Sequence, residues 1–179
     1  MDESKVIFII AFNGFQNIEY AIPKHIIESE GFAVVTASDR HGVAIAQNGS
    51  TTHVEVVLDK IIVNQYCGIL FIGGPGALEH LDNHTSYKLL QEASQLHIPV
   101  GAICIATRIL AKAGILSGKE ATGWNDDEQL LPLYKEYNVI YADNDVVVDD
   151  NIITAAGPQA AQKFGELFVQ MLHKKQQWG

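Results

Sequence analysis

The amino-acid sequence predicts an α/β fold in which helices cover both faces of a mostly parallel central sheet. Short runs rich in Val, Ile and Phe recur along the 179 residues. Uninterrupted apolar runs of this kind are typical of strands buried on both faces. Segments with helical spacing of apolar residues lie between the runs, and this alternation is typical of parallel sheets. We find neither a linker nor an internal repeat, so we expect one domain over residues 1–179.

The predicted strands are short, apolar and rich in β-branched residues. In chain order they are 5–11, 32–38, 67–72, 98–103, 139–142, 146–148 and 152–155. The last two are joined at Asp150-Asn151. Segments 43–46 and 52–56 flank Asn48-Gly49, a dipeptide that favours a β-hairpin.

The predicted helices have apolar residues three and four positions apart, together with capping residues. They are 17–30, about 85–96, 105–113, a segment after Asn125, and about 159–173. Gly31 is placed to close the first helix, and Thr85 or Ser86 can cap the second. Asn125 is expected to cap an acidic first turn over 126–128, where negative charge complements the helix dipole.

Composition argues against several classes of function. Lys and Arg number 12 against 21 Asp and Glu, which gives a net charge of −9. Nucleic-acid binding relies on clustered positive charge, and the sequence has none. No apolar run approaches the roughly 20 residues of a membrane helix, and the first residues lack the basic leader of a signal peptide. The two cysteines have no metal-ligand spacing. We therefore expect a cytoplasmic protein with no metal or other cofactor and no nucleic-acid or membrane partner.

Cys104 is the candidate nucleophile. In AICIATRILAKAGIL it lies between a predicted strand and a predicted helix, with Ala102 and Ala106 two residues to either side. A sharp strand-to-helix turn needs small residues at both offsets, and it exposes the central side chain. The start of the helix favours a thiolate. The alternative is an inert core thiol, which is the common fate of a single cysteine. Cys67 begins a strand, and we expect it in or near the core.

Two further features fall at the carboxyl edge of the predicted sheet, where ligands bind in such folds. Glu19 follows the first strand, although it could also be a surface acid at a helix start. Gly73-Gly74 follows the third strand, and its amides could stabilise an oxyanion or could simply form a turn. Together with Cys104 they predict one crevice.

Three segments resemble the ThiJ/PfpI (DJ-1) superfamily: QNIEYAIP, ILFIGGPGALEHL and VGAICIATRILAKAGILSGKEAT. The resemblance implies a flavodoxin-like three-layer sandwich that forms a homodimer. It also implies that Cys104 is the nucleophile and that Glu19 is a protonated partner carboxyl group. The implied oxyanion amides belong to Gly74 and Ile105. Gly73, Thr107 and Trp124 are the further residues expected at the pocket.

The sequence departs from family patterns at the positions that would supply histidine. Ile105 stands where peptidase-like members have a histidine directly after the cysteine, and Ala106-Thr107 replaces Gly-Pro or Gly-Ser. Trp124 stands where another branch keeps a histidine, and Gln16 where some members have a second acid. Peptide hydrolysis needs a general acid for the leaving amine, so we do not expect it. The seven histidines are expected at the surface, although His25, His80 or His84 could fold towards the site.

The resemblance and its departures leave several functions open. The first is an enzyme that acts on a small reactive carbonyl compound through a Cys–Glu dyad, as a glutathione-independent glyoxalase or deglycase. The second is a redox sensor or stress-response protein with an oxidisable cysteine. The others are isocyanide-hydratase-like or amidase-like hydrolysis without histidine, and a scaffold with a vestigial site.

Overall fold

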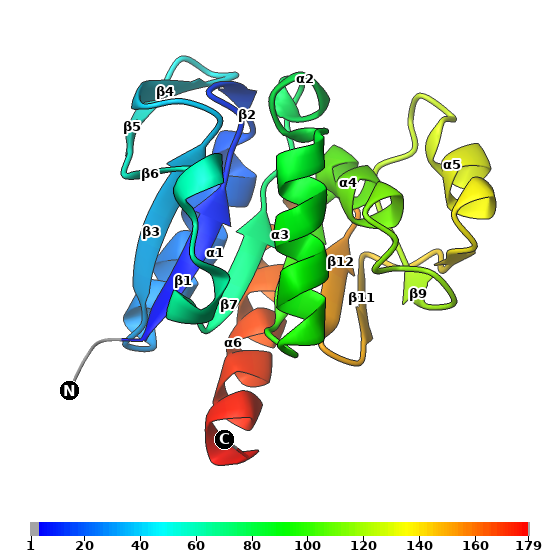
Figure 1. Ribbon diagram of the computed structural model, residues 1–179. Helices are drawn as coiled ribbons and strands as arrows, with labels where there is room; N and C mark the ends of the chain where they lie inside the picture. Colours follow the sequence, from blue (N-terminus) through cyan, green and yellow to red (C-terminus); the bar gives the residue numbers. More distant parts are fainter. Residues whose placement is uncertain (1–3, 179) are drawn as a thin grey trace.

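A seven-stranded sheet forms the centre of the structure, a computed structural model that describes residues 4–178 (Figure 1). Its strand order is β11-β12-β8-β7-β1-β3-β6, and every pairing is parallel except that of β11 with β12. The strands of this sheet are β1 (Lys5–Ile9), β3 (Ala33–Ser38), β6 (Val56–Val57), β7 (Gly68–Phe71), β8 (Val100–Ile103), β11 (Val146–Asp149) and β12 (Ile152–Ala155). The predicted fold class is confirmed.

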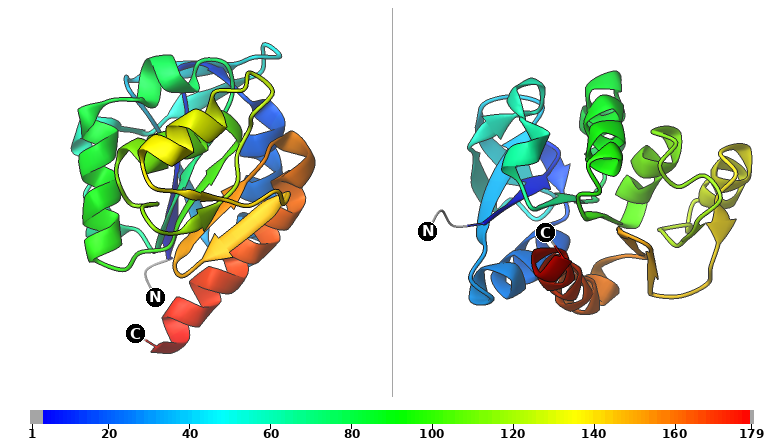
Figure 2. Two further views of the ribbon diagram at one scale, coloured as in Figure 1. Left: turned by 90° about the vertical axis from the view of Figure 1, so that its right-hand side faces the viewer. Right: turned by 60° about the horizontal axis from the view of Figure 1, so that its bottom comes forward.

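Helices cover both faces of this sheet, and β1 shows why. Its side chains alternate between two cores, with Ile7 and Ile9 on one face and Val6 and Phe8 on the other. The first core packs against helices α3, α4 and α5, and the second packs against α1 and α6 (Figure 2, right). The helices are α1 (Asn17–Ser29), α2 (Ala77–Leu81), α3 (His84–Gln95), α4 (Thr107–Lys112), α5 (Leu130–Glu136) and α6 (Ala161–Trp178).

Two smaller sheets and four short 3₁₀ helices complete the fold. Strands β2 (Asn13–Phe15), β4 (Gly42–Ala46) and β5 (Thr51–Val54) form one small sheet, and β9 (Glu120–Ala121) pairs with β10 (Ile140–Tyr141). The β4–β5 pair is antiparallel and turns at Gly49 with φ +86°, which confirms the predicted hairpin. The 3₁₀ helices are η1 (Leu58–Lys60), η2 (Val63–Gln65), η3 (Cys104–Ala106) and η4 (Pro158–Ala160).

Two predicted helix starts are wrong. Asn83, rather than Thr85 or Ser86, caps α3, and its side chain accepts a hydrogen bond from the Ser86 N–H at 3.1 Å. Segment 126–128 is a turn instead of the first turn of a helix, because the Asn125 side chain accepts from the Leu130 N–H at 2.9 Å and delays the start of α5.

The topology brings the three predicted site segments to one edge of the sheet. Strands β1, β7 and β8 are parallel neighbours. Their carboxyl ends therefore meet at the edge that carries β2 and α2 in Figure 1. None of the helices within residues 4–178 is long and apolar enough to cross a membrane.

Candidate active site

Cys104 occupies a strained turn where β8 ends and η3 begins. Its φ of +62° lies in the left-handed region, which is costly for any residue with a Cβ and is typical of a nucleophile elbow. Ala102 and Ala106 on either side are fully buried. The Cys104 carbonyl oxygen accepts from the Thr107 hydroxyl at 3.0 Å and from the Trp124 N–H at 3.3 Å. The turn is thus held from two later segments, and the side chain is left half-buried.

Glu19 reaches the same place from the first turn of α1. The Gln16 side-chain oxygen caps this helix, accepting from the N–H groups of Ile18 at 2.6 Å and Glu19 at 3.1 Å. The Glu19 side chain is fully buried. Its Oε2 accepts from the Gly73 N–H at 2.9 Å, whereas its Oε1 is buried without a hydrogen-bond partner. An oxygen without a partner is free to carry a proton.

Burial is the main cause of the shifted pKa values of Glu19 and Cys104. It raises the pKa of Glu19 from 4.5 to about 7, against the lowering effects of the Cys104 thiol and the Gly73 N–H. Burial and the Glu19 carboxylate also raise the pKa of Cys104, while the N–H groups of Ile105 and Gly74 lower it. The two groups therefore share one proton above neutrality and titrate as a pair.

This result corrects the expectation that the helix start alone would favour a thiolate. The helix begins with the 3₁₀ turn η3 and continues in only six residues of α4. Its dipole is too weak to outweigh the burial of the Cys104 sulfur.

The Gly73-Gly74 loop fits between the two reactive groups because it has no side chains. A Cβ on Gly73 would lie 2.6 Å from Glu19 Oε2 and 2.8 Å from Cys104 Cβ. Gly74 has φ +117°, which glycine adopts without strain. The Gln16 N–H donates to the Gly73 carbonyl at 2.9 Å. Glycine at 73 is thus required for close approach, and glycine at 74 for conformation.

A cavity of about 300 Å³ opens above this pair. Its lining residues are Gln16, Glu19, Gln47, Gly74, Pro75, Cys104, Ile105, Trp124 and Pro158. The structure therefore brings together Cys104, Glu19, Gly74, Ile105 and Trp124, as the sequence predicts.

Thr107 and Gly73 differ from that expectation, since neither lines the cavity. Thr107 holds the Cys104 carbonyl, and the Gly73 N–H holds the Glu19 carboxyl group. Sequence reasoning missed Gln47, Pro75 and Pro158. Gln47 arrives from the hairpin because its N–H donates to the Phe15 carbonyl at 2.9 Å, a long-range contact with no local sequence signal.

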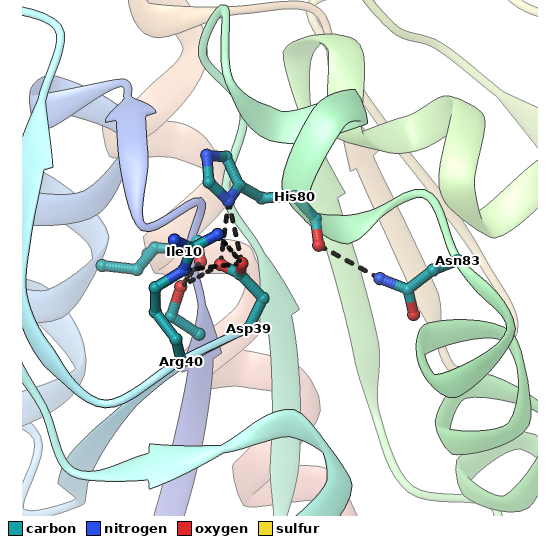
Figure 3. Close-up of polar contacts among 6 residues, drawn as sticks. Ile10, Asp39, Arg40, His80 and Asn83 are labelled. Carbon is teal, nitrogen blue, oxygen red and sulfur yellow. Dashed lines mark hydrogen bonds and ion pairs between the residues drawn. The ribbon is translucent and has the colours of Figure 1, made fainter.

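No histidine is among the residues that line this cavity. His80, which follows the Gly-Gly loop, is engaged elsewhere. Its Nδ1 lies 3.0 Å from both carboxylate oxygens of Asp39, which also pairs with Arg40 (Figure 3). The Asn83 side chain donates to the His80 carbonyl at 3.0 Å. Within residues 4–178, no three His, Cys, Asp or Glu side chains are grouped so that they could hold a metal ion.

Cys67 lies at the opposite edge of the sheet, beside a larger hollow of about 890 Å³. Its thiol donates to the Lys5 carbonyl at 3.2 Å, and burial raises its pKa to about 11. The acid of this hollow, Glu55, accepts from the Thr36 N–H at 2.7 Å. Size alone therefore does not identify the site, because this larger hollow lacks an acid paired with its cysteine.

Comparisons with known proteins agree with this geometry. A sequence model of the DJ-1/PfpI family matches residues 4–171. An uncharacterized protein of Methanocaldococcus jannaschii is 36% identical over 92% of this chain and 80% of its own. Deglycase PfpI of Pyrococcus furiosus is 27% identical over 94% of this chain and 99% of its own. The crystal structure of a ThiJ/PfpI domain protein from Brachyspira murdochii superimposes with a TM-score of 0.91, at 25% identity, over 96% of this chain and 98% of that one.

Proposed function

The chain belongs to the DJ-1/PfpI family, and on that premise we propose that it is a cysteine-dependent enzyme of the glyoxalase or deglycase type that acts on small reactive carbonyl compounds. The observation that carries the proposal is the buried Glu19 carboxyl group beside Cys104, with a pKa raised to about 7 by burial. A group with this pKa can both give and take a proton near neutrality.

In the first proposed step, the Glu19 carboxylate takes the Cys104 thiol proton, and the resulting thiolate adds to the aldehyde carbon of a 2-oxoaldehyde such as methylglyoxal. A carbon–sulfur bond forms, and the electron pair of the carbonyl bond moves onto oxygen. The N–H groups of Gly74 and Ile105 stabilise this oxyanion. Glu19 then donates its proton to the oxygen, which leaves a neutral hemithioacetal and a Glu19 carboxylate.

In the second proposed step, the Glu19 carboxylate removes the proton from the carbon that bears sulfur and returns it to the neighbouring carbon. The hydroxyl proton moves at the same stage from the oxygen of the sulfur-bearing carbon to the neighbouring carbonyl oxygen, through the enediol. The hemithioacetal thereby becomes the thioester of a 2-hydroxy acid. Water hydrolyses the thioester, releases the acid and restores the thiol. The sum is 2-oxoaldehyde plus water to 2-hydroxy acid, so no external oxidant or reductant is consumed.

The names of several relatives in the family support the same chemistry. Several archaeal relatives about as similar as the Pyrococcus furiosus protein are named deglycases. For an adduct of an aldehyde with an amine, displacement of the amine by the Cys104 thiolate leads to the same hemithioacetal. The cavity lacks a histidine to protonate an unactivated leaving group, which favours carbonyl adducts over peptides.

Turnover of methylglyoxal to lactate tests the proposal. We expect activity in the wild type and in Cys67→Ser, and none in Cys104→Ser or Glu19→Gln. Glu19→Gln keeps a hydrogen-bond donor beside the sulfur but cannot shuttle a proton. Activity that survives in Cys104→Ser, or a wild type that leaves methylglyoxal and its amine adducts unchanged, would contradict the proposal.

A redox sensor is the second candidate, and the unpartnered Oε1 of Glu19 favours it. A protonated Oε1 can donate to an oxygen of a Cys104 sulfinate, which forms when two equivalents of peroxide oxidise the thiol and are reduced to water. Mass spectrometry after limited peroxide treatment tests this candidate. The sensor predicts the gain of two oxygen atoms at Cys104 without carbonyl turnover.

A further inference from the structure

The Cys104 cavity meets a second cavity at Trp124 and Pro158, which line both. The second cavity measures about 420 Å³ and is polar, with carboxylates that include Asp126 and Asp143. Nothing in the proposed reaction uses this space. Trp124 therefore borders both the small, largely apolar cavity and the larger polar one.

Trp124 is fixed at both its ring and its backbone. The guanidinium carbon of Arg108 lies 5.4 Å from the centre of the indole ring, within the range of a cation–π contact. Arg108 Nη2 also donates to the Trp124 carbonyl at 3.2 Å. The Trp124 N–H in turn donates to the Cys104 carbonyl at 3.3 Å. The position of the ring is thus coupled to the turn that carries the nucleophile.

Asp127 holds Arg108 in place. Arg108 Nη1 donates to Asp127 Oδ2 at 3.0 Å, and Nη2 donates to Oδ1 at 2.5 Å, in a forked ion pair. The Arg108 side chain is 5% exposed, and its Nε is buried without a partner. A buried guanidinium depends on the contacts it does have. Arg108 therefore keeps its position over the indole only while Asp127 is paired with it.

We propose that Trp124 is the specificity-determining residue of the Cys104 cavity, and that Arg108, held by Asp127, is the positioning residue that keeps it closed to bulky compounds. Substrates are then short-chain carbonyl compounds that fit within about 300 Å³. The substrate class rests on the proposed function, whereas the size limit on access to the thiol does not.

Alkylation of Cys104 by reagents of different size tests the size limit directly, in a Cys67→Ser background. The rates for iodoacetamide and N-(1-pyrenyl)maleimide are measured with wild-type Trp124, Trp124→Phe and Trp124→Ala. We expect the ratio of bulky to small reagent to rise about tenfold or more in Trp124→Ala, and less in Trp124→Phe. An unchanged ratio in both folded variants would overturn the proposal.

A parallel turnover assay separates this proposal from the proposed function. Methylglyoxal and phenylglyoxal are compared as substrates, and Trp124→Ala is expected to gain on phenylglyoxal relative to methylglyoxal. If neither aldehyde is turned over by any variant, the proposed function fails while the alkylation ratio still decides the role of Trp124. If aldehydes are turned over and the alkylation ratio stays constant, only the role of Trp124 fails.

Asp127→Asn tests the positioning role, with Asp126→Asn as a matched control in the same turn. Asp127→Asn should raise the bulky-to-small ratio several-fold, and Asp126→Asn should leave it unchanged. In the Trp124→Ala background, Asp127→Asn should have no further effect. The emission of Trp124, isolated by Trp178→Phe, should shift in Asp127→Asn only. An additive effect of Asp127→Asn on Trp124→Ala, or an unshifted spectrum, would contradict the positioning role.

Discussion

The two cysteines occupy opposite edges of the same sheet, and comparing them shows what makes one a candidate nucleophile. Both are half-buried, and burial raises the pKa of both thiols. Cys67 continues from an ordinary loop and donates to the Lys5 carbonyl at 3.2 Å. Cys104 sits at a positive φ and shares a proton with Glu19. Burial by itself makes a thiol less reactive, so the difference lies in the acid that can take the proton.

The largest expected difference between the two cysteines is in their rates of alkylation, and this difference tests which of them is the nucleophile. At neutral pH, a thiol with a pKa of about 11 is almost entirely protonated. Burial raises the pKa of Cys104 too, to about 12, so its advantage lies in the adjacent Glu19 carboxylate, which can accept the thiol proton as the sulfur reacts. We expect this general-base assistance to make iodoacetamide modify Cys104 about 100-fold faster than Cys67, as followed by peptide mass spectrometry. Preferential modification of Cys67 in the folded protein would refute the assignment of the nucleophile.

The stability of the protein should fall as pH rises through the range of Glu19. The Glu19 pKa is raised from 4.5 in the reference state to about 7 in the fold. An acid with a raised folded pKa binds its proton more tightly in the folded state. The stabilisation that this tighter proton binding gives to the folded state is therefore fully present below about pH 4.5 and is lost by about pH 7. The expected loss is roughly 3 kcal/mol, measured by urea unfolding at several pH values.

Glu19→Gln should remove this pH dependence and be the more stable protein above neutrality. The exposed helix acid Glu92 supplies the control, since Glu92→Gln should retain the wild-type profile. If the free energy of unfolding changes with pH in the same way in the wild type and in Glu19→Gln, the carboxyl group is not buried in solution.

The hydrogen bond that Glu19 donates to the sulfur should lower the pKa of the Cys104 thiol. Glu19→Gln keeps a donor beside the thiolate and Glu19→Leu does not, so the thiol pKa should be higher in Glu19→Leu. A hydrogen bond to a charged group contributes about 1.5–3 kcal/mol, which corresponds to about one to two pKa units. Thiolate absorbance against pH measures the difference, and coincident curves would mean that Glu19 does not contact the sulfur.

Cys67→Ser should have the smallest effect. A serine hydroxyl can donate to the Lys5 carbonyl as the thiol does, so we expect a change in the free energy of unfolding within about 0.5 kcal/mol. The rate of Cys104 alkylation should not change. A large effect on that rate would show that the two edges of the sheet are coupled.

Local patterns were sufficient to predict the central sheet and the elbow. The apolar runs around Ile7 and Ile69 are buried, as their composition requires, and the fully buried small residues Ala102 and Ala106 mark the turn at Cys104. What the sequence did not reveal depends on distant partners. The sequence predicts that Asp127 lies in the acidic first turn of a helix, but in the structure it forms an ion pair with Arg108. Gln47 and Pro158 reach the cavity only after separate parts of the chain assemble.

Gly73 lies between Glu19 and Cys104, and the three residues come together because β1, β7 and β8 are neighbours in the sheet. Strand β8, which ends at the cysteine, also pairs with β12, close to the end of the chain. In the unfolded chain Cys67 and Cys104 are two ordinary thiols, and the pair of Cys104 with Glu19 exists only when these distant segments have joined the sheet. The selectivity of alkylation at Cys104 is therefore a chemical readout of whether the sheet has formed.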